Sequence, residues 1–233
     1  MIRVVTYNVS GGLDTSAVSS VLRRLDPTIV CLLERPGGGR LRNVAKACNL
    51  EVVARAGRRG SGTAILASDR VRVLASARVP LTVPKDVPAR EATQAILGVD
   101  GLRLSVTAVQ FGLRPEVRRT NQVELLAYLD SIDLPKIVGA DLNESVRAPV
   151  ATELAEVFQD AYGIAGGPGG ETYPTNDPST RQDFVFVDRR HRVLACKVPN
   201  EPPVDVASHH RPVLAEIEGA PVDAERAEED DHS

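Results

Sequence analysis

Aromatic residues are scarce in this chain: they make up 3% of its 233 residues, and tryptophan is absent. Proteins that hold single-stranded nucleic acid often stack the bases on aromatic side chains, so a base-stacking surface is not expected here. The net charge is also small, at −3, and six acidic residues with one basic residue lie between Asp223 and the C-terminus. The remaining body has 27 basic and 25 acidic residues, a net charge of +2. That balance does not indicate a general nucleic-acid binder.

Signals for membranes and export are missing as well. No run of 18 apolar residues is present, and Met1–Tyr7 has the composition of a strand rather than of a secretory signal. The three cysteines, Cys31, Cys48 and Cys196, are odd in number and form no C-x-x-C pair, which favours reduced and buried thiols. We therefore expect a cytoplasmic, monomeric protein without a membrane partner.

Helices and strands alternate irregularly, with no linker or repeat before residue 219. Asp14 is expected to cap a helix that ends near Leu25, and Pro115 to start one that ends at Asp130. Asp100-Gly101 is typical of a hairpin turn. Further helices are expected through Ala47 and near 148–156, with loops at 36–39 and 163–180. Strands are expected at 2–9, 28–34, 51–55, 62–68, 71–80, 91–99, 102–109, 136–140, 182–187, 192–198 and 211–217.

This order of elements predicts an α+β fold. Hairpin connections exclude a purely parallel sheet, and two packed sheets with helices outside fit the number of strands. We expect one domain over residues 1–218, followed by a disordered acidic tail at 219–233. An autoinhibitory role of that tail over a basic cleft is the alternative.

The segment Ile137–Glu144 carries the most informative motif. An apolar strand runs into the sequence Gly-x-Asp-x-Asn, which sets Asp141 and Asn143 two residues apart at the strand end. Residues two apart on an extended chain point to the same face. An acceptor and an amide donor side by side suit work on a phosphate and its attacking water.

Other polar residues also lie at expected strand ends, where side chains from several strands can converge on one rim. Each has an ordinary alternative: Asn8 as a turn residue, Glu34 as a solvated carboxylate, and a His-His pair as a surface turn. A carboxylate at Asp183, inside an apolar strand, is costly to bury unless it is paired. The set consists of Asn8, Glu34, Gln110, Asp141, Asn143, Asp183, His209 and His210.

Taken together, these motifs resemble the endonuclease/exonuclease/phosphatase superfamily, which has the deoxyribonuclease-I-like fold. The resemblance spans residues 2–217 and is most specific in the Asp-x-Asn turn and in the Arg-x-Asp-x-x-Phe strand from Arg181 to Phe186. It implies a four-layer α/β/β/α sandwich with two central mixed sheets. It also implies cleavage of phosphoester bonds with a divalent metal, usually Mg²⁺, with Mn²⁺ as a second option.

The resemblance also implies a role for each residue. Glu34 would hold the metal, with Asn8 beside it, and a carboxylate and an amide oxygen suit a hard cation. Asp141 would orient or deprotonate the attacking water, and Asn143 would donate to a phosphate oxygen. Three further roles are implied: His210 on the opposite side of the phosphate, Asp183 orienting a catalytic neighbour, and Arg90 near the substrate.

The chain departs from the family pattern at three positions. Gln110 stands where a histidine is common; it can donate to a phosphate but cannot carry a proton. His209 stands where the family favours aspartate, and it could ligate a softer ion such as Mn²⁺ or Zn²⁺. A smaller departure is Leu33, where glutamine is frequent.

These departures leave two hypotheses open. The first is an active metal-dependent phosphohydrolase, a nuclease or a small-molecule phosphoesterase. The second is a weak or inactive relative that binds a phosphorylated ligand or a partner protein. The near-neutral body, the few aromatics and the absence of an extended basic tract favour a small phosphoester over duplex DNA, and a nucleic-acid substrate stays open.

Overall fold

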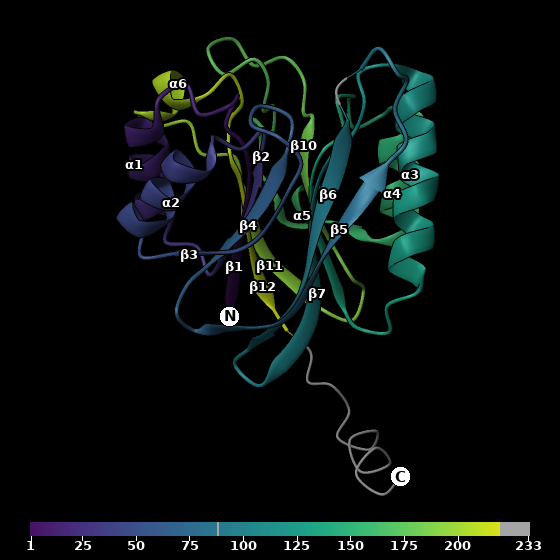
Figure 1. Ribbon diagram of the computed structural model, residues 1–233, viewed down its shortest axis with the longest axis horizontal. Helices are drawn as coiled ribbons and strands as arrows, with labels where there is room; N and C mark the ends of the chain where they lie inside the picture. Colours follow the sequence, from purple (N-terminus) through teal and green to yellow (C-terminus); the bar gives the residue numbers. More distant parts are fainter. Residues whose placement is uncertain (88, 220–233) are drawn as a thin grey trace, which may run out of the picture.

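The computed structural model describes residues 1–87 and 89–219. Two six-stranded sheets pack face to face, and helices cover the outer face of each sheet (Figure 1). The expected α+β sandwich with four layers and two central mixed sheets is thereby confirmed. Apart from its first residue, Gly219, the acidic tail expected at 219–233 lies outside the described residues.

Each sheet is mixed, because a single parallel pair lies among antiparallel ones. In sheet 1 the parallel pair is β1–β2, and in sheet 2 it is β7–β8. The strands of sheet 1, in spatial order, are β11 (Arg192–Lys197), β12 (Val213–Glu218), β1 (Ile2–Asn8), β2 (Ile29–Leu33), β4 (Thr63–Ala67) and β3 (Glu51–Ala56). Those of sheet 2 are β5 (Val71–Leu81), β6 (Arg90–Val99), β7 (Leu102–Gln110), β8 (Lys136–Asp141), β10 (Asp183–Val187) and β9 (Gln159–Asp160).

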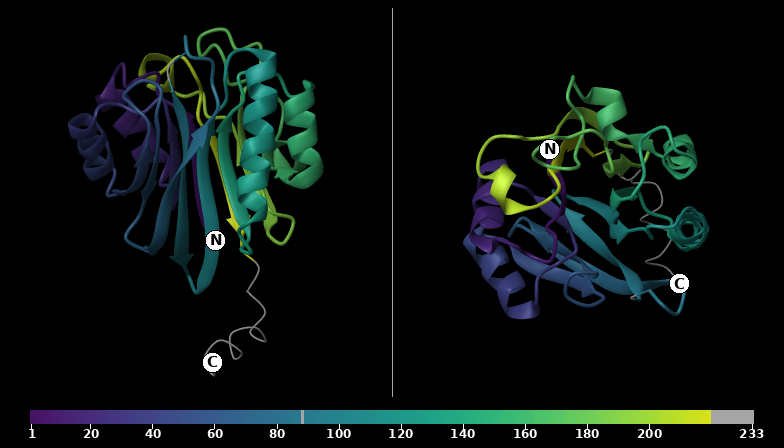
Figure 2. Two further views of the ribbon diagram at one scale, coloured as in Figure 1. Left: turned by 45° about the vertical axis from the view of Figure 1, so that its right-hand side comes forward. Right: turned by 90° about the horizontal axis from the view of Figure 1, so that it is seen from above.

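The helices form the two outer layers, as the view from above shows (Figure 2). On the side of sheet 1 lie α1 (Thr15–Leu25), α2 (Gly38–Ala47) and the short α6 (Val204–Ala207). On the side of sheet 2 lie α3 (Pro115–Asp130) and α4 (Pro149–Val157), while α5 (Ala161–Ala165) packs against β10 and β11. The expected cap of α1 is present, because the Asp14 side chain accepts from the backbone of Ser16 and Ala17.

The core between the sheets is unusually tight beside Gly139. A Cβ on Gly139 would lie 2.4 Å from Cys31 Cβ and 2.4 Å from Thr6 Oγ1, closer than a side chain allows. Only glycine therefore lets β8 approach β1 and β2 this closely. Asp141 lies two residues further along the same face of β8, so the close approach brings its carboxylate against the end of sheet 1.

Three short elements were not expected from the sequence. β9 has two residues, α6 has four, and α5 has five, held at its start by the Asp160 side chain, which accepts from the Tyr162 backbone. Elements of this length are too short for a hydrophobic period to develop. In addition, α2 begins inside the expected loop at 36–39. No helix in the described part of the chain is both long and apolar enough to cross a bilayer.

Candidate active site

The polar residues at the strand ends gather at one end of the sandwich, the upper end in Figure 1. Parallel strands β1 and β2 end side by side with Asn8 opposite Leu33, and β7 and β8 end with Gln110 opposite Asp141. The antiparallel strand β10 begins at the same end, with Asp183 opposite Asp141. The topology therefore brings residues from both sheets to one rim.

Two carboxylates share two amide donors at this rim. Asn8 Nδ2 donates to Glu34 Oε1 at 3.1 Å and to Asp141 Oδ2 at 2.9 Å. Gln110 Nε2 donates to the same two oxygens, at 2.7 Å and 3.0 Å. The two acids, one from each sheet, are thus cross-linked by neutral hydrogen-bond donors rather than by cations.

A partly buried arginine, Arg90, lies next to these two carboxylates. Arg90 Nη1 donates a short hydrogen bond to Gln110 Oε1. The Gln110 amide therefore accepts from Arg90 with its oxygen and donates to the two carboxylates with its nitrogen. Burial lowers the pKa of Arg90, and the negative charges of Asp141 and Glu34 act in the opposite direction. Arg90 Nε is buried without a hydrogen-bond partner among the described residues. The guanidinium therefore faces the two carboxylates through Gln110.

The Asp141 carboxylate is fully buried. Burial and the neighbouring Asp183 raise its pKa, while His210 and the donors from the Asn143 backbone and Asn8 oppose that shift. Asn143 is held locally: its backbone N–H donates to Asp141 Oδ1 at 2.9 Å, and its Nδ2 donates to Phe111 O at 2.8 Å.

Two of the site residues adopt a left-handed backbone. Glu34 has a φ of 47° and Asn143 a φ of 52°. Non-glycine residues rarely adopt this conformation, and it is often found where a side chain must be aimed. At Glu34 it takes the residue out of the alternation of β2, so that its carboxylate reaches Asn8 and Gln110.

Asp183 and His210 form a buried pair. His210 Nδ1 lies 2.8 Å from Asp183 Oδ2, and the Tyr173 ring lies against the imidazole with 4.8 Å between ring centroids. Burial disfavours the charged imidazole, but Asp183, Asp141 and Glu34 outweigh it and raise the pKa of His210 to about 9. The histidine is therefore a cation at neutral pH.

A hard cation fits the oxygen atoms of this rim. Mg²⁺ usually takes one or two protein carboxylates and fills its other positions with water and phosphate. Glu34 is a partly exposed carboxylate, and no hydrogen bond to its Oε2 is found among the described residues. In addition, carboxylate oxygens of Asp141 and Asp183 lie within 4.8 Å of each other, and Asp183 Oδ1 is buried without a partner in the described chain.

Two residues expected near the metal are arranged differently. Asn8 turns its nitrogen toward the carboxylates, since its Oδ1 accepts from the Ser10 backbone at 2.9 Å; in this orientation it offers no oxygen to a cation there. The His209 side chain is exposed, and the hydrogen bonds that His209 forms within the described ranges, to Thr175 and Ser10, come from its backbone. The rim thus brings together Asn8, Glu34, Arg90, Gln110, Asp141, Asn143, Asp183 and His210, with His209 at its edge.

Sequence reasoning missed two residues of this site. Thr172 Oγ1 accepts from the backbones of Gln182 and Asp183 and so fixes the start of β10. Tyr173 packs on His210. Both lie in the segment expected to be loop, where no periodicity marks a residue; the sequence Thr-Tyr-Pro within a glycine-rich stretch is the one local signal.

Comparison with known structures gives the same architecture. A functionally unknown conserved protein from Enterococcus faecalis has a TM-score of 0.82 at 19% identity, covering 94% of this chain and 100% of that chain. An endonuclease/exonuclease/phosphatase from Bacteroides vulgatus has a TM-score of 0.81 at 21% identity, with 93% and 98% covered. A mannosyl-6-phosphatase from Bacteroides thetaiotaomicron has a TM-score of 0.82 at 15% identity, with 94% and 100% covered.

Sequence comparison identifies the family. No curated protein matches the chain. The model of the Endonuclease/Exonuclease/phosphatase family, however, matches residues 5–214, nearly the whole of the described chain. The protein therefore belongs to the endonuclease/exonuclease/phosphatase family.

Proposed function

We propose that this protein is a divalent-metal-dependent phosphoesterase that hydrolyses a phosphodiester or phosphomonoester by in-line attack of water. The observation that carries the proposal is the pair of carboxylates, Glu34 and Asp141, that share two donors and lie beside the Asp183–His210 pair. Membership of the family supports a phosphoester substrate. The structural neighbour described as a mannosyl-6-phosphatase supports it as well.

In this proposal Glu34 holds the metal, Mg²⁺ or Mn²⁺. When bound, the ion would polarise a phosphoryl oxygen and offset the charge that develops on the phosphate. Asn8 acts through hydrogen bonds that fix Glu34 and Asp141, rather than as a ligand. His209 is retained as a candidate ligand at the rim.

Asp141 is proposed to take the proton of the attacking water. Its raised pKa suits a base, because a carboxylate of higher proton affinity accepts a proton more readily in the transition state. The donors from Asn8 and Gln110 hold one carboxylate oxygen, and the Asn143 backbone holds the other. The base is therefore fixed in position before the substrate binds.

His210 is proposed to stabilise or protonate the group opposite the water. The Asp183 carboxylate orients its ring through Nδ1 and keeps it charged. One N–H of Asn143 is taken by Phe111 O, which leaves its second N–H for a phosphate oxygen. Gln110 and Arg90 supply the positive potential that a histidine at position 110 would otherwise provide.

The same proposal includes the domain organisation, the oligomeric state and the cellular location of the enzyme. Residues 1–218 act as one catalytic domain, as a monomer in the cytoplasm. The three cysteines support a reducing compartment, since all are buried and none is bridged.

Hydrolysis of small chromogenic esters tests the proposal. Bis(p-nitrophenyl) phosphate and p-nitrophenyl phosphate would be assayed with Mg²⁺, Mn²⁺, Ca²⁺ and Zn²⁺ for the wild type, Glu34→Gln and the control Glu156→Gln, an exposed carboxylate on α4. We expect metal-dependent turnover that Glu34→Gln lowers roughly 100-fold or more and that the control retains. Thermal shift on adding metal should also be lost in Glu34→Gln.

The alternative is a weak or inactive relative that binds a phosphorylated ligand or a partner. Gln110 favours it, because this residue cannot transfer a proton where the family commonly has histidine. If no metal supports turnover and Glu34→Gln leaves the metal-induced thermal shift unchanged, the phosphoesterase proposal is overturned and the binding role stands.

A further inference from the structure

Positive charge is unevenly distributed in this nearly neutral protein. Residues 35–62 contain seven basic residues and one acidic residue, Glu51. That segment therefore carries +6, and the rest of the body before Asp223 carries −4. An average over the whole chain conceals a basic segment that begins directly after Glu34. The seven basic residues are Arg35, Arg40, Arg42, Lys46, Arg55, Arg58 and Arg59.

Six of these seven side chains are exposed, all except Arg35. Elsewhere arginines are commonly neutralised: eight of them form ion pairs with acidic residues, including Arg70 with Asp100 and Arg192 with Glu218. None of the basic residues at 35–62 pairs with a carboxylate of the described chain. Their charge is thus available to an external anion.

Arg35 fixes this basic segment beside the candidate site. It is 8% exposed, and its guanidinium donates to the backbone oxygens of Pro36, Ala56 and Gly57. Burial lowers its pKa, the nearby Arg55 and Arg78 add to that effect, and the Glu91 carboxylate opposes it. Through these hydrogen bonds to backbone oxygens, Arg35 anchors the turn between β3 and β4 to the end of β2.

That turn, Gly57–Gly62, carries Arg58 and Arg59 at the site end of the molecule. The Arg35 backbone donates to Gly62 O at 2.9 Å and accepts from Gly60 N at 3.1 Å, one residue after Glu34. On its other side Gly57 N donates to Glu91 Oε2 at 2.5 Å, next to Arg90. The turn is therefore tied to the residues that follow Glu34 and Arg90 in the chain.

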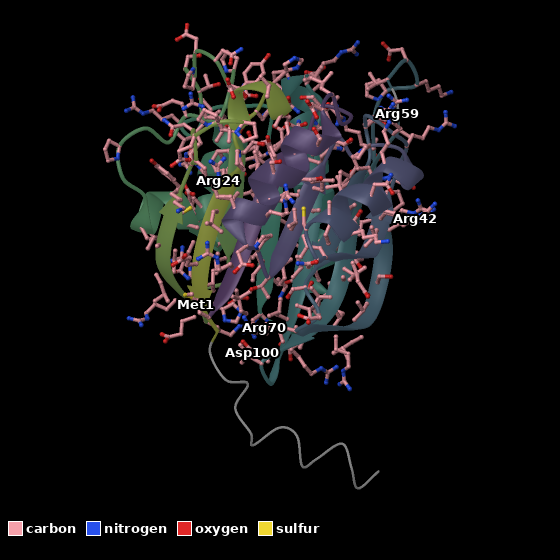
Figure 3. All side chains as sticks on the ribbon, turned by 90° about the vertical axis from the view of Figure 1, so that its left-hand side faces the viewer. Met1, Arg24, Arg42, Arg59, Arg70 and Asp100 are labelled. Atoms are coloured by element: carbon pink, nitrogen blue, oxygen red, sulfur yellow. The ribbon has the colours of Figure 1, made fainter. Side chains whose placement is uncertain are left out.

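The exposed arginines extend away from the site over one face. Figure 3 shows Arg59 near the upper end, Arg42 further down the same side, and Arg70 with Asp100 at the opposite end of the molecule. Arg55 lies against the start of α2, since its Nη1 would be 2.8 Å from a Cβ on Gly38. The cations are thus spread along a surface that leads away from Glu34 rather than gathered in one pocket.

We propose that this basic face, formed by Arg40, Arg42, Arg55, Arg58 and Arg59, binds the phosphate backbone of a nucleic-acid strand whose scissile phosphate lies at the Glu34–Asp141 site. This proposal rests on the proposed phosphoesterase function, and it names nucleic acid as the substrate class of that enzyme. Guanidinium groups match phosphate oxygens in a two-pronged geometry. Several of them in a row fit a chain of phosphates better than the single phosphate of a small ester.

Two observations favour nucleic acid over an anionic membrane and define how it is held. No large apolar side chain of residues 35–62 is exposed, and peripheral membrane binding generally adds apolar insertion to charge. Residues 35–62 contain no aromatic residue, so this face offers no aromatic ring on which a base could stack. Binding through phosphates alone makes affinity strongly salt-dependent and nearly independent of sequence.

Fluorescence anisotropy with a labelled 20-nucleotide single strand, in EDTA and over a series of KCl concentrations, tests the proposal. The full chain would be compared as wild type, R58Q/R59Q and R70Q/R72Q. The last variant has the same change of charge, because it removes two exposed arginines: Arg70, at the opposite end in Figure 3, and Arg72, which pairs with Gly98 close to the Asp100 turn. Arg40→Gln with Arg42→Gln gives a second variant on the basic face, on helix α2.

We expect R58Q/R59Q to weaken binding about tenfold and to reduce the slope of log K against log [KCl] by about 1.4, the value for two phosphate contacts on a single strand. R70Q/R72Q should stay within about twofold of the wild type. Equal losses in R58Q/R59Q and R70Q/R72Q, or no loss in either variant of the basic face, would overturn the proposal. Tight binding to phosphatidylglycerol vesicles without binding to the oligonucleotide would overturn it too.

This measurement separates the two proposals, because binding in EDTA needs no hydrolysis. Turnover of bis(p-nitrophenyl) phosphate without arginine-dependent oligonucleotide binding keeps the phosphoesterase and removes the nucleic-acid face. Arginine-dependent binding without turnover of any ester removes the phosphoesterase and keeps the face as a binding surface.

Discussion

The two ends of the sandwich differ in how their charged side chains are buried and paired. At the site end, Asp141 and Asp183 are fully buried, and a single histidine is the only cationic group that hydrogen-bonds to them in the described chain. At the other end, Arg70 pairs with Asp100 while both side chains are about half exposed (52% and 40%). Buried charges that are incompletely paired cost stability, whereas exposed pairs contribute little. The destabilising arrangement lies where catalysis is proposed, and the exposed pair, with little effect on stability, lies at the opposite end.

Among the substitutions that test this contrast, Asp141→Asn should have the largest effect, on catalytic activity. Removing the proposed base is expected to lower kcat/KM roughly 100- to 10,000-fold. The free energy of unfolding should change by no more than about 1 kcal/mol at pH 7, because two effects oppose each other. The exchange removes a buried carboxylate and its repulsion from Asp183, but it also places an amide nitrogen against one of the donors from Asn8, Gln110 or Asn143 and removes the attraction to His210. Ester hydrolysis and urea unfolding measure the two quantities.

A matched exchange at the other end provides the control. Asp100→Asn should leave turnover unchanged, since Asp100 lies in the hairpin turn between β6 and β7, at the opposite end from the site. If Asp141→Asn keeps its turnover, Asp141 is not the base. If it lowers turnover and also lowers the free energy of unfolding by several kcal/mol, the carboxylate is a structural element and the contrast between the ends fails.

The next largest effect is expected from the Asp183–His210 pair, whose contribution to the free energy of unfolding should depend on pH. The pKa of His210 is raised to about 9 in the folded protein, against about 6.5 in an unfolded chain. A raised pKa means that the pair stabilises fully below about pH 6.5 and that this contribution disappears as the pH rises through about 9. It corresponds to about 3 kcal/mol.

Urea unfolding between pH 6 and 10 measures this loss. His210→Gln can still donate to Asp183 but cannot titrate, so the difference in stability between the two proteins should shrink toward high pH. A constant difference over that range would mean that His210 is neutral in the folded protein. In that case the site end has no buried ion pair.

Much of this site end could be predicted from the sequence, for a simple physical reason. Strand ends are marked by a change from apolar to polar residues, and parallel pairing brings such ends together. Gln110 and Asp141, for instance, lie opposite each other at the end of β7 and β8. The four-layer fold followed from the same strands and hairpins together with the family resemblance, and it is confirmed.

The remaining features depend on orientation and on long-range contacts, which no local pattern encodes. The Asn8 amide turns its nitrogen to the carboxylates because the Ser10 backbone holds its oxygen. Tyr173 reaches His210 from a loop 37 residues earlier. The basic face was visible in the sequence but was hidden by averaging charge over the whole chain, and the fold explains it by tying Arg35 to the turn that carries Arg58 and Arg59.

The exposed pair Arg70–Asp100 should give the smallest effect, and salt sharpens the comparison between the two ends. In a double-mutant cycle with Arg70→Gln and Asp100→Asn, the coupling free energy should be at most about 0.5 kcal/mol in 0.1 M KCl. Asparagine tolerates the left-handed backbone at position 100, where φ is 49°, so the turn is preserved. At 1 M KCl the Debye length is about 3 Å and this coupling should vanish.

The same cycle on Asp183→Asn and His210→Gln should keep most of its coupling free energy at 1 M KCl, because water and ions do not reach a buried pair. Equal salt sensitivity at both ends would show that solvent screens the Asp183–His210 pair as it does a surface pair, and the buried-charge account of the site would then be wrong.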